Sequence, residues 1–188
     1  MLILDTSVVL NLVGTGDPRL ILKHLREKVC VPPAVLKEVK REPHTDGELS
    51  LSELIEDGVI VVIECTSEIN ALALELAGAP SPDDLGDGES FAISCAACLE
   101  VKVGIDDQKA RRILRAHWPK IVQWFTIDLI ALAANHGNLR AAHHAELVYL
   151  ALRNARMRVP KERRMEIAKL IGNERARDCP SLGFINNS

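Results

Sequence analysis

Residues 2–12 read LILDTSVVLNL: an apolar triplet, then Asp5-Thr6-Ser7, then a second apolar run. The triplet predicts a short strand. Asp, Thr and Ser are the residue types preferred at the N-cap of a helix, so a helix is expected to begin there and to continue through Leu12. The opening stretch therefore predicts a strand that passes directly into a helix.

The same alternation continues along the chain. The run Val59–Ile63 contains only β-branched residues, which is typical of a strand buried on both faces of a parallel sheet. Further short strands are expected at residues 29–31, 101–105 and 121–125. Helices are expected at residues 34–41, 48–56, 67–77, 89–99, 109–116 and 129–135, and two more within 141–171, broken near Val159-Pro160.

Strands that alternate with helices form βαβ units. The fold class is therefore α/β, with a central parallel sheet of about five short strands and helices on both faces. In such sheets, ligands bind beyond the carboxyl ends of the strands. The residues that follow each strand are the first place to look for a functional site.

The composition limits the classes of protein that fit. The chain has 188 residues, 47% hydrophobic and 26% charged, which excludes a disordered or collagen-like chain. No apolar run approaches the roughly 20 residues of a membrane span, and the apolar start ends at Asp5, so neither a membrane segment nor a signal peptide is expected. Aromatic residues make up only 3%, which argues against an RNA-recognition module built on stacking aromatics. The net charge is −3, so a nucleic-acid binder would need a local basic patch.

The cysteine content predicts a reducing environment. There are five cysteines and no export signal, so a cytoplasmic location is expected rather than a disulfide framework. Cys95-Ala-Ala-Cys98 lies in an apolar helical run. Small buried helix residues are the expected role of this pair, and a zinc or redox site is the alternative.

Acidic residues follow the predicted strands. Asp5 follows the first strand, Asp106-Asp107 follow the fourth, Glu38 lies in the helix after the second, and Glu89 lies in a first helical turn after the loop 79–88. Because these positions belong to the carboxyl end of one sheet, we expect the side chains to converge. Two carboxylates about 4 Å apart repel by roughly 4 kcal/mol at an effective dielectric constant of 20, so such a cluster needs protons or a cation. Oxygen-only ligation suits Mg²⁺ or Mn²⁺ rather than Zn²⁺. Taken singly, each acid also fits a cap or a solvated surface charge.

Four segments, in this order, resemble the PIN-domain nuclease family. They are LILDTSV (2–8), VPPAVLKEV (31–39), LGDGESFAI (85–93) and IDDQKAR (105–111). Residues 154–171 loosely resemble the C-terminal helices of a bacterial and archaeal branch related to VapC toxins. The resemblance implies a PIN-like three-layer α/β/α domain over residues 1–137, a helical extension packed on it over 138–171, and a polar tail over 172–188.

The resemblance also implies an activity. It is that of a toxin-type endoribonuclease that uses Mg²⁺ or Mn²⁺ to hydrolyse RNA phosphodiester bonds, with RNA, an antitoxin protein and a second copy of the chain as partners. By position, the catalytic residues would be Asp5, Glu38, Glu89, Asp106 and Asp107; the metal ligands would be Asp5, Glu89, Asp106 and Asp107; and Thr6 or Ser7 would support the site.

Three details of this site differ from the family or stay open. Asp106 directly follows its strand and is favoured over Asp107 as the closer metal ligand. Many family members have Asp where this chain has Glu89, so the metal is expected to shift slightly. After the fifth strand the branch usually has Gly-Thr, whereas this chain has Phe125-Thr126-Ile127-Asp128. We expect Asp128 to cap a helix at the surface, with a further charge near the site as the alternative.

Two groups of basic residues are candidates for binding a nucleic-acid backbone. One lies on the helix after Asp106-Asp107 and comprises Lys109, Arg111, Arg112 and Arg115. The other is the segment Arg153–Arg164, with six basic residues and one acid. Such density favours phosphate binding. Solvated helix faces, or arginines that pair with distant acids, are the alternatives.

Other functional classes remain open from the sequence. A catalytically silent PIN-like module that binds RNA or protein would keep the fold without turnover. A flap or repair nuclease would act on DNA instead of RNA. A phosphoryl-acceptor domain also places acids at strand ends, but Glu38 and Glu89 do not fit a single phosphorylated Asp.

Overall fold

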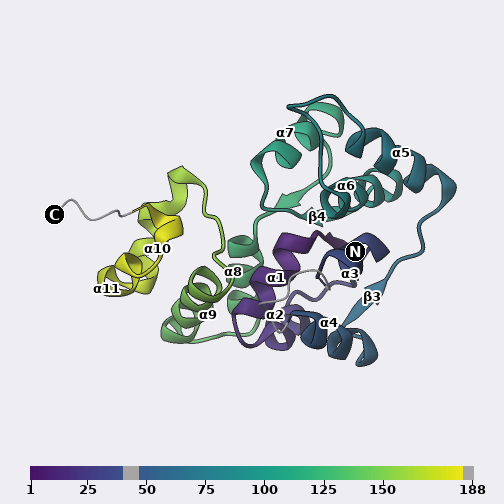
Figure 1. Cartoon of the computed structure of the whole chain (residues 1–188). Coiled ribbons are helices and arrows are strands. Elements are labelled where there is room, and N and C mark those ends of the chain that lie inside the picture. Colours follow the sequence, from purple (N-terminus) through teal and green to yellow (C-terminus); the bar gives the residue numbers. More distant parts are fainter. Residues whose placement is uncertain (40–46, 184–188) are drawn as a thin grey trace.

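The elements of the computed structural model, which describes residues 1–39 and 47–183, alternate as the sequence predicts (Figure 1). The strands are β1 (Leu2–Leu4), β2 (Val29–Val31), β3 (Ile60–Val62), β4 (Lys102–Gly104) and β5 (Gln123–Trp124). The helices before β5 are α1 (Thr6–Gly14), α2 (Pro18–His24), α3 (Pro33–Val39), α4 (Gly47–Glu56), α5 (Ser67–Ala77), α6 (Asp87–Leu99) and α7 (Gln108–His117). After β5 come α8 (Thr126–His136), α9 (Ala141–Asn154), η1 (Lys161–Arg163), α10 (Arg164–Ile171), α11 (Asn173–Arg177) and η2 (Pro180–Leu182).

The five strands form one all-parallel sheet in the order β3-β2-β1-β4-β5, which confirms the predicted α/β fold class. Strand β1 lies in the centre, hydrogen-bonded to β2 on one side and to β4 on the other. The strand order reverses between β1 and β4. In open α/β sheets this switch point is where a ligand crevice forms, beyond the carboxyl ends of the two strands. Asp5 and Asp106 therefore follow neighbouring strands at the expected position of a ligand crevice.

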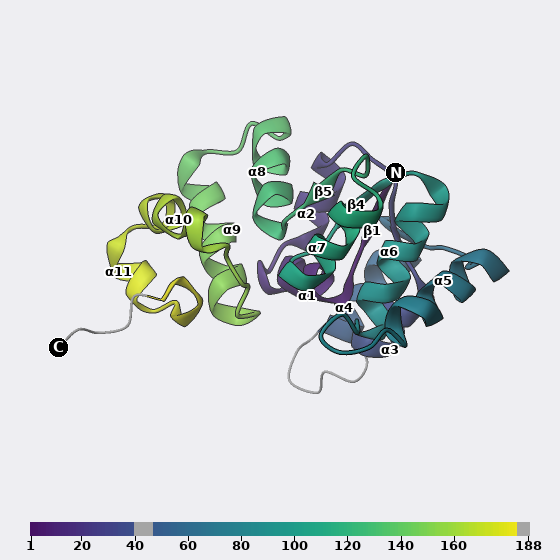
Figure 2. The same ribbon diagram turned by 90° about the horizontal axis from the view of Figure 1, so that it is seen from above.

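Two hydrophobic layers cover the sheet, because successive side chains of a strand point to opposite faces. Leu2 and Leu4 pack into a layer with α1, α2, α4, α8 and α9. Ile3 and Cys30 pack into the other layer, with α5, α6 and α7. Seen from above, α5 and α6 lie on one side of the molecule, and α8 and α9 on the other (Figure 2). This is the three-layer α/β/α arrangement predicted from the sequence.

Several boundaries differ from the sequence prediction. Strand β5 is only two residues long, and α8 begins at Thr126, three residues earlier than expected. Helix α6 begins at Asp87 rather than at Glu89. Helix α9 ends at Asn154 and residues 155–160 are not helical, so the break predicted near Val159-Pro160 is present and begins several residues before this pair. Residues 40 and 41 of the helix predicted at 34–41 lie outside the described residues.

The C-terminal helices share the core of the sheet domain. Buried side chains of α9 and α10 belong to the same hydrophobic layer as Leu2 and Leu4. Part of the segment predicted to be a polar tail forms α11 and η2, with Ala176 and Leu182 buried in that layer; residues 184–188 lie outside the described residues. Over residues 1–39 and 47–183, no helix combines the length and the apolar character needed to cross a membrane.

Candidate active site

Asp5 lies at the junction of β1 and α1 and serves as the N-cap of this helix. Its Oδ1 accepts a hydrogen bond from the backbone N–H of Val8 at 2.7 Å, and the Ser7 hydroxyl donates to both carboxylate oxygens at 3.0 Å. The residue is completely buried (0% exposed). Ser7, one of the two predicted supporting residues, therefore holds the Asp5 carboxylate in place.

Thr6, the other predicted supporting residue, contacts Glu38 instead. Its hydroxyl donates to Glu38 Oε2, while Glu38 Oε1 accepts from the backbone N–H of Gly88 at 2.8 Å. Glu38 thus joins α1, α3 and the first turn of α6. A Cβ atom at Gly88 would lie 2.2 Å from Glu38 Oε2 and 2.3 Å from Thr6 Oγ1. Only glycine leaves room for this carboxylate.

Glu89 lies next to Gly88 in the first turn of α6. Its Oε2 accepts from the backbone N–H of Gly86 at 3.3 Å, which closes the start of α6. An acid in the first turn of a helix also interacts favourably with the helix dipole. Glu38 binds the N–H of Gly88, which directly precedes Glu89. The position of Glu89 therefore depends on Glu38.

Asp106 is held by a buried network from two helices. Its Oδ2 accepts from Asn11 Nδ2 at 2.7 Å and from Thr126 Oγ1 at 2.5 Å, and its Oδ1 accepts from the Thr126 N–H at 2.8 Å. Asp106 is 8% exposed, and both partners are buried. The sequence analysis missed Asn11 and Thr126 as site residues. The signals for them were a single polar residue inside the apolar helix run 8–13, and a hydroxyl directly after the fifth strand.

Asp107 plays a different part from Asp106. It is the N-cap of α7, and its Oδ1 accepts from the Ala110 N–H at 2.9 Å. Asp106 and Asp107 both line a cavity of about 470 Å³, together with Glu89, Ser7 and Asn11. The structure therefore brings Asp106, Asp107 and Glu89 to one cavity, with Asp5 buried beside Asp106.

The electrostatics of these acids point to a missing positive charge. Burial raises the pKa of Asp5 well above its usual range, and the charge of Asp106 raises it further. Burial also raises the pKa of Asp106, against the hydrogen bonds from Thr126 and Asn11, and it raises that of Glu89, with Asp107 as the next cause. Between residues 1–39 and 47–183, no Lys, Arg or His forms an ion pair with Asp5, Glu38, Glu89, Asp106 or Asp107.

The donor atoms suit a hydrated divalent cation. In the part of the chain that the structure describes, no three Asp, Glu, His or Cys side chains stand close enough together to hold a metal ion by themselves. Mg²⁺, however, usually keeps several waters and binds one or two carboxylates plus the phosphate of a substrate. Oxygen-only donors with uncompensated charge fit such an ion and do not fit the nitrogen and sulfur ligands preferred by Zn²⁺.

The predicted basic group on α7 is divided by the structure. Arg111 is 8% exposed, with its guanidinium 3.5 Å from the centre of the Phe125 ring and its Nη1 donating to the Ile105 carbonyl at 3.0 Å. Arg112 pairs with Asp83, and Lys109 lies 3.6 Å from an Asp84 carboxylate oxygen. Arg115 is exposed and, with Lys109 and Arg112, lines a hollow of about 490 Å³. Arg111 also contributes to this hollow, although its side chain is buried and its guanidinium packs against Phe125.

Asp128 takes the capping position expected of it. It accepts from the Phe125 N–H at 3.0 Å at the start of α8 and pairs with Arg163. Arg163 belongs to the second basic segment, so at least one arginine of that segment is neutralised.

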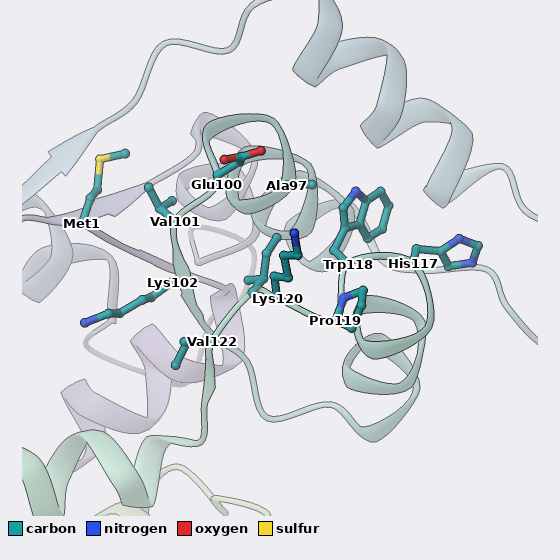
Figure 3. A pocket seen from close by; sticks show the side chains of 11 residues that line it. Met1, Ala97, Glu100, Val101, Lys102, His117, Trp118, Pro119, Lys120 and Val122 are labelled. Carbon is teal, nitrogen blue, oxygen red and sulfur yellow. The ribbon is translucent and has the colours of Figure 1, made fainter.

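A hollow of about 660 Å³ lies at the opposite edge of the sheet. Met1, Val101 and Val122 come from the amino ends of β1, β4 and β5, and Trp118 closes one side (Figure 3). Glu100 is its one acidic lining residue. This hollow has none of the acids that follow the strands, so the candidate active site lies at the carboxyl edge.

Comparison with known proteins places the chain in a family. A family model described as a PIN domain matches residues 1–173. No curated protein and no solved structure matches the chain. The match includes all five strands and continues through α9 and α10.

Proposed function

Because the chain belongs to the PIN-domain family, whose members are typically metal-dependent nucleases, we propose that it is an endoribonuclease that requires Mg²⁺ or Mn²⁺. The observation that supports this most strongly is the group of carboxylates at the switch point of the sheet. Asp5 and Asp106 are buried there, Glu89 and Asp107 are half-buried, and none of the four has an ion-pair partner within residues 1–39 and 47–183. Asp5 and Asp106 follow neighbouring strands there, and Glu89 and Asp107 line the same cavity.

Four carboxylates of the site would bind the cation. Asp5, Glu89, Asp106 and Asp107 would hold the cation directly or through its waters. Bound Mg²⁺ or Mn²⁺ would supply the charge that polarises a phosphodiester and lowers the pKa of the attacking water. Glu89 Oε1 and Asp107 Oδ2 have no hydrogen-bond partner within the described residues, so both oxygens remain available in the cavity.

The remaining polar side chains act as positioning residues. Ser7 fixes the Asp5 carboxylate, and Asn11 and Thr126 fix that of Asp106. Glu38 has both oxygens engaged, by Thr6 and by the Gly88 N–H. Its role is therefore to hold the first turn of α6, and with it Glu89, against α1.

Asp5→Asn tests this function, with Asp17→Asn as the matched control. Both aspartates are N-caps whose side chains accept a backbone N–H, and Asn caps as well as Asp, so both variants should fold. We expect Asp5→Asn to lose RNA cleavage by more than the roughly 10–100-fold typical of losing an outer-shell group, and to lose Mg²⁺ binding in calorimetry. Asp17→Asn should keep both. Wild-type activity in Asp5→Asn would contradict the assignment.

The finer features of this proposal come from the VapC-like resemblance. We propose RNA rather than DNA as the substrate, a toxin-type role with an antitoxin partner, a homodimer, and a cytoplasmic location. Competition between labelled RNA and unlabelled DNA of the same sequence tests the substrate. RNA binding without turnover in the wild-type protein would favour the silent binding module instead.

A further inference from the structure

The segment that joins α9 to η1, residues 155–160, forms a strap beside the candidate active site (Figure 1). Burial alternates along it. Met157 and Val159 are buried in the core layer of α1 and α9, whereas Arg156 and Arg158 are exposed. The strap is therefore anchored by its apolar residues and presents its arginines outward.

Local contacts fix this strap against α1. Asn154 Nδ2 donates to the carbonyl oxygen of Gly14, the last residue of α1, at 2.9 Å. A Cβ atom at Gly14 would lie 2.7 Å from the Cβ of Ala155, so the two segments touch directly. Arg156 adopts a φ of 54°, which is uncommon for a residue with a side chain and persists only where the surroundings impose it. The position of the two arginines is thus set by packing.

Both arginines line the cavity that holds the acids. Its lining contains Glu89, Asp106 and Asp107 together with Arg156 and Arg158. Arg158 also lines a neighbouring hollow of about 550 Å³ that again reaches Asp106 and Asp107. Arg158 therefore stands between two hollows that open onto the same pair of aspartates.

These arginines differ from the other basic residues nearby. Lys109, Arg112 and Arg163 each have an acidic partner, and Arg111 is buried under Phe125. Within residues 1–39 and 47–183, neither Arg156 nor Arg158 forms a side-chain hydrogen bond or an ion pair. A cavity lined both by carboxylates that could hold a cation and by guanidinium groups without a partner among the described residues fits a phosphate bound by the cation and the arginines together.

We propose that Arg156 and Arg158 bind the phosphate backbone of a single-stranded RNA where it enters the acidic cavity. This inference rests on the proposed nuclease function and names substrate-binding residues for it. No Phe, Tyr or Trp lines either hollow in the described part of the chain, so the strap offers phosphate contacts but no surface on which bases stack. Phosphate contacts carry no sequence information, so the strap should bind RNAs of different sequence equally well.

The test compares Arg156→Gln/Arg158→Gln with the control Arg153→Gln. Arg153 lies on the last turn of α9, donates to the Tyr149 hydroxyl at 2.8 Å and lines neither hollow, so it controls for the loss of positive charge. RNA affinity is measured by fluorescence anisotropy in an Asp5→Asn background, with a fluorescein-labelled single-stranded RNA and Mg²⁺. KM and kcat are measured with Asp5 present, and thermal unfolding checks the fold.

We expect the double variant to bind RNA at least about 10-fold more weakly, with KM raised more than kcat is lowered. The slope of log affinity against log salt should fall by about 0.7 for each phosphate that the variant no longer neutralises, and RNAs of different sequence should lose affinity equally. Arg153→Gln should keep the wild-type RNA affinity and the wild-type slope of log affinity against log salt. Any small change should be no larger than expected from removing one charge far from the cavity.

The outcomes separate this inference from the nuclease function. Cleavage by the wild type, with KM, affinity and salt slope unchanged in the double variant, would overturn the role of the strap and leave the nuclease. RNA binding without cleavage, weakened in the double variant alone, would support the strap and remove the nuclease. A wild type that neither binds nor cleaves RNA would overturn both.

Discussion

At the scale of single residues, the site depends on a position that has no side chain. Gly88 lies in the first turn of α6, where its N–H binds Glu38 and where a Cβ would collide with Glu38 and Thr6. Glycine within a helix usually costs about 1 kcal/mol relative to alanine. At position 88 glycine should instead be more stable than alanine, because the Cβ of alanine would displace the Glu38 carboxylate.

Gly88→Ala is therefore expected to destabilise the protein by about 1–3 kcal/mol, the range for losing the hydrogen bonds of a buried charged group. It should also lower cleavage, since Glu38 holds the turn that carries Glu89. Urea unfolding and RNA cleavage measure the two effects. The control is Gly86→Ala, whose Cβ would meet Glu89 and Glu38 only at 3.8 and 3.9 Å. A Gly88→Ala variant more stable than the wild type would contradict the crowding argument.

At the scale of elements, the sequence predicted the alternation of strands and helices but not where some of them end. The five strands lie where apolar runs predicted them. A strand of a parallel sheet is covered on both faces, so its own residues are mostly apolar and can be recognised locally. Helix α8 begins early because Thr126 binds Asp106, which is 20 residues away in sequence. Helix α9 ends at Asn154, whose side chain donates to Gly14, and Met157 and Val159 of the following segment are buried in the core. Such long-range contacts leave no periodic signal.

In the site, too, local sequence features could be predicted and long-range contacts could not. That Asp5, Asp106 and Asp107 lie near one another could be predicted, because they come after two strands whose carboxyl ends meet at the same edge of a parallel sheet. The hydrogen bonds that fix them could not be inferred, since they join α1, the end of β4 and the start of α8 across the fold. Nor could the sequence separate the buried Arg111 from the exposed Arg115 on one helix.

The network around Asp106 gives a prediction at this scale. Thr126→Val removes the hydroxyl that donates to Asp106 Oδ2 and leaves a buried carboxylate with one partner fewer. We expect a loss of about 1–3 kcal/mol in the free energy of unfolding, together with reduced cleavage, because α8 no longer fixes this acid. Thr126→Ser keeps the hydroxyl and should retain most of both. A loss in Thr126→Ser with wild-type behaviour in Thr126→Val would show that the methyl group, which valine keeps and serine lacks, matters rather than the hydrogen bond.

An ion pair at the opposite edge of the sheet should make stability depend on pH. Glu27, which precedes β2, accepts from Lys102 Nζ of β4 at 2.7 Å, and the Met1 amino group lies 3.5 Å away. Partial burial raises the pKa of Glu27, but Lys102 and the amino group together lower it below its usual 4.5. A carboxylate with a lowered pKa in the folded state stabilises the fold above its unfolded pKa, and this contribution is lost as the pH falls through the lowered value.

Glu27→Gln should therefore cost up to about 1 kcal/mol at pH 7, as expected for a solvent-accessible pair whose carboxylate is half-buried. The difference from the wild type should shrink as the pH falls below 4.5. Urea unfolding at several pH values measures it. In a Lys102→Met background the same substitution should cost less, because its main partner is gone. A stability difference that grows toward low pH would contradict the sign of this argument.

At the scale of the whole molecule, the C-terminal extension forms part of the fold of the sheet domain. The hydrophobic layer under β1 takes side chains from α9, the strap, α10, α11 and η2 as well as from α1 and α8. In both views α10 and α11 lie on the side of the molecule away from α5 and α6 (Figures 1 and 2). Since this layer is continuous, we expect the extension and the sheet to unfold together.

Met157→Ala tests this continuity, with Met165→Ala as the control. Met157 is 1% exposed in the strap, whereas Met165 is 60% exposed on α10. Truncating a buried methionine to alanine costs about 2–5 kcal/mol, and the exposed one should change stability by less than about 0.5 kcal/mol. Both tryptophans, Trp118 and Trp124, lie outside the extension, so their fluorescence reports on the sheet domain, while far-UV circular dichroism reports on all helices.

A single cooperative fold requires that both signals shift by the same amount in Met157→Ala, because one transition unfolds everything. An extension that folds separately would instead lose its circular dichroism signal first and leave the tryptophan transition in place. The strap also carries Arg156 and Arg158, so the loss of its anchor at Met157 should weaken RNA binding even below the unfolding midpoint. Met165→Ala, which removes a methionine from the same extension without touching the core, should leave both transitions and RNA binding unchanged.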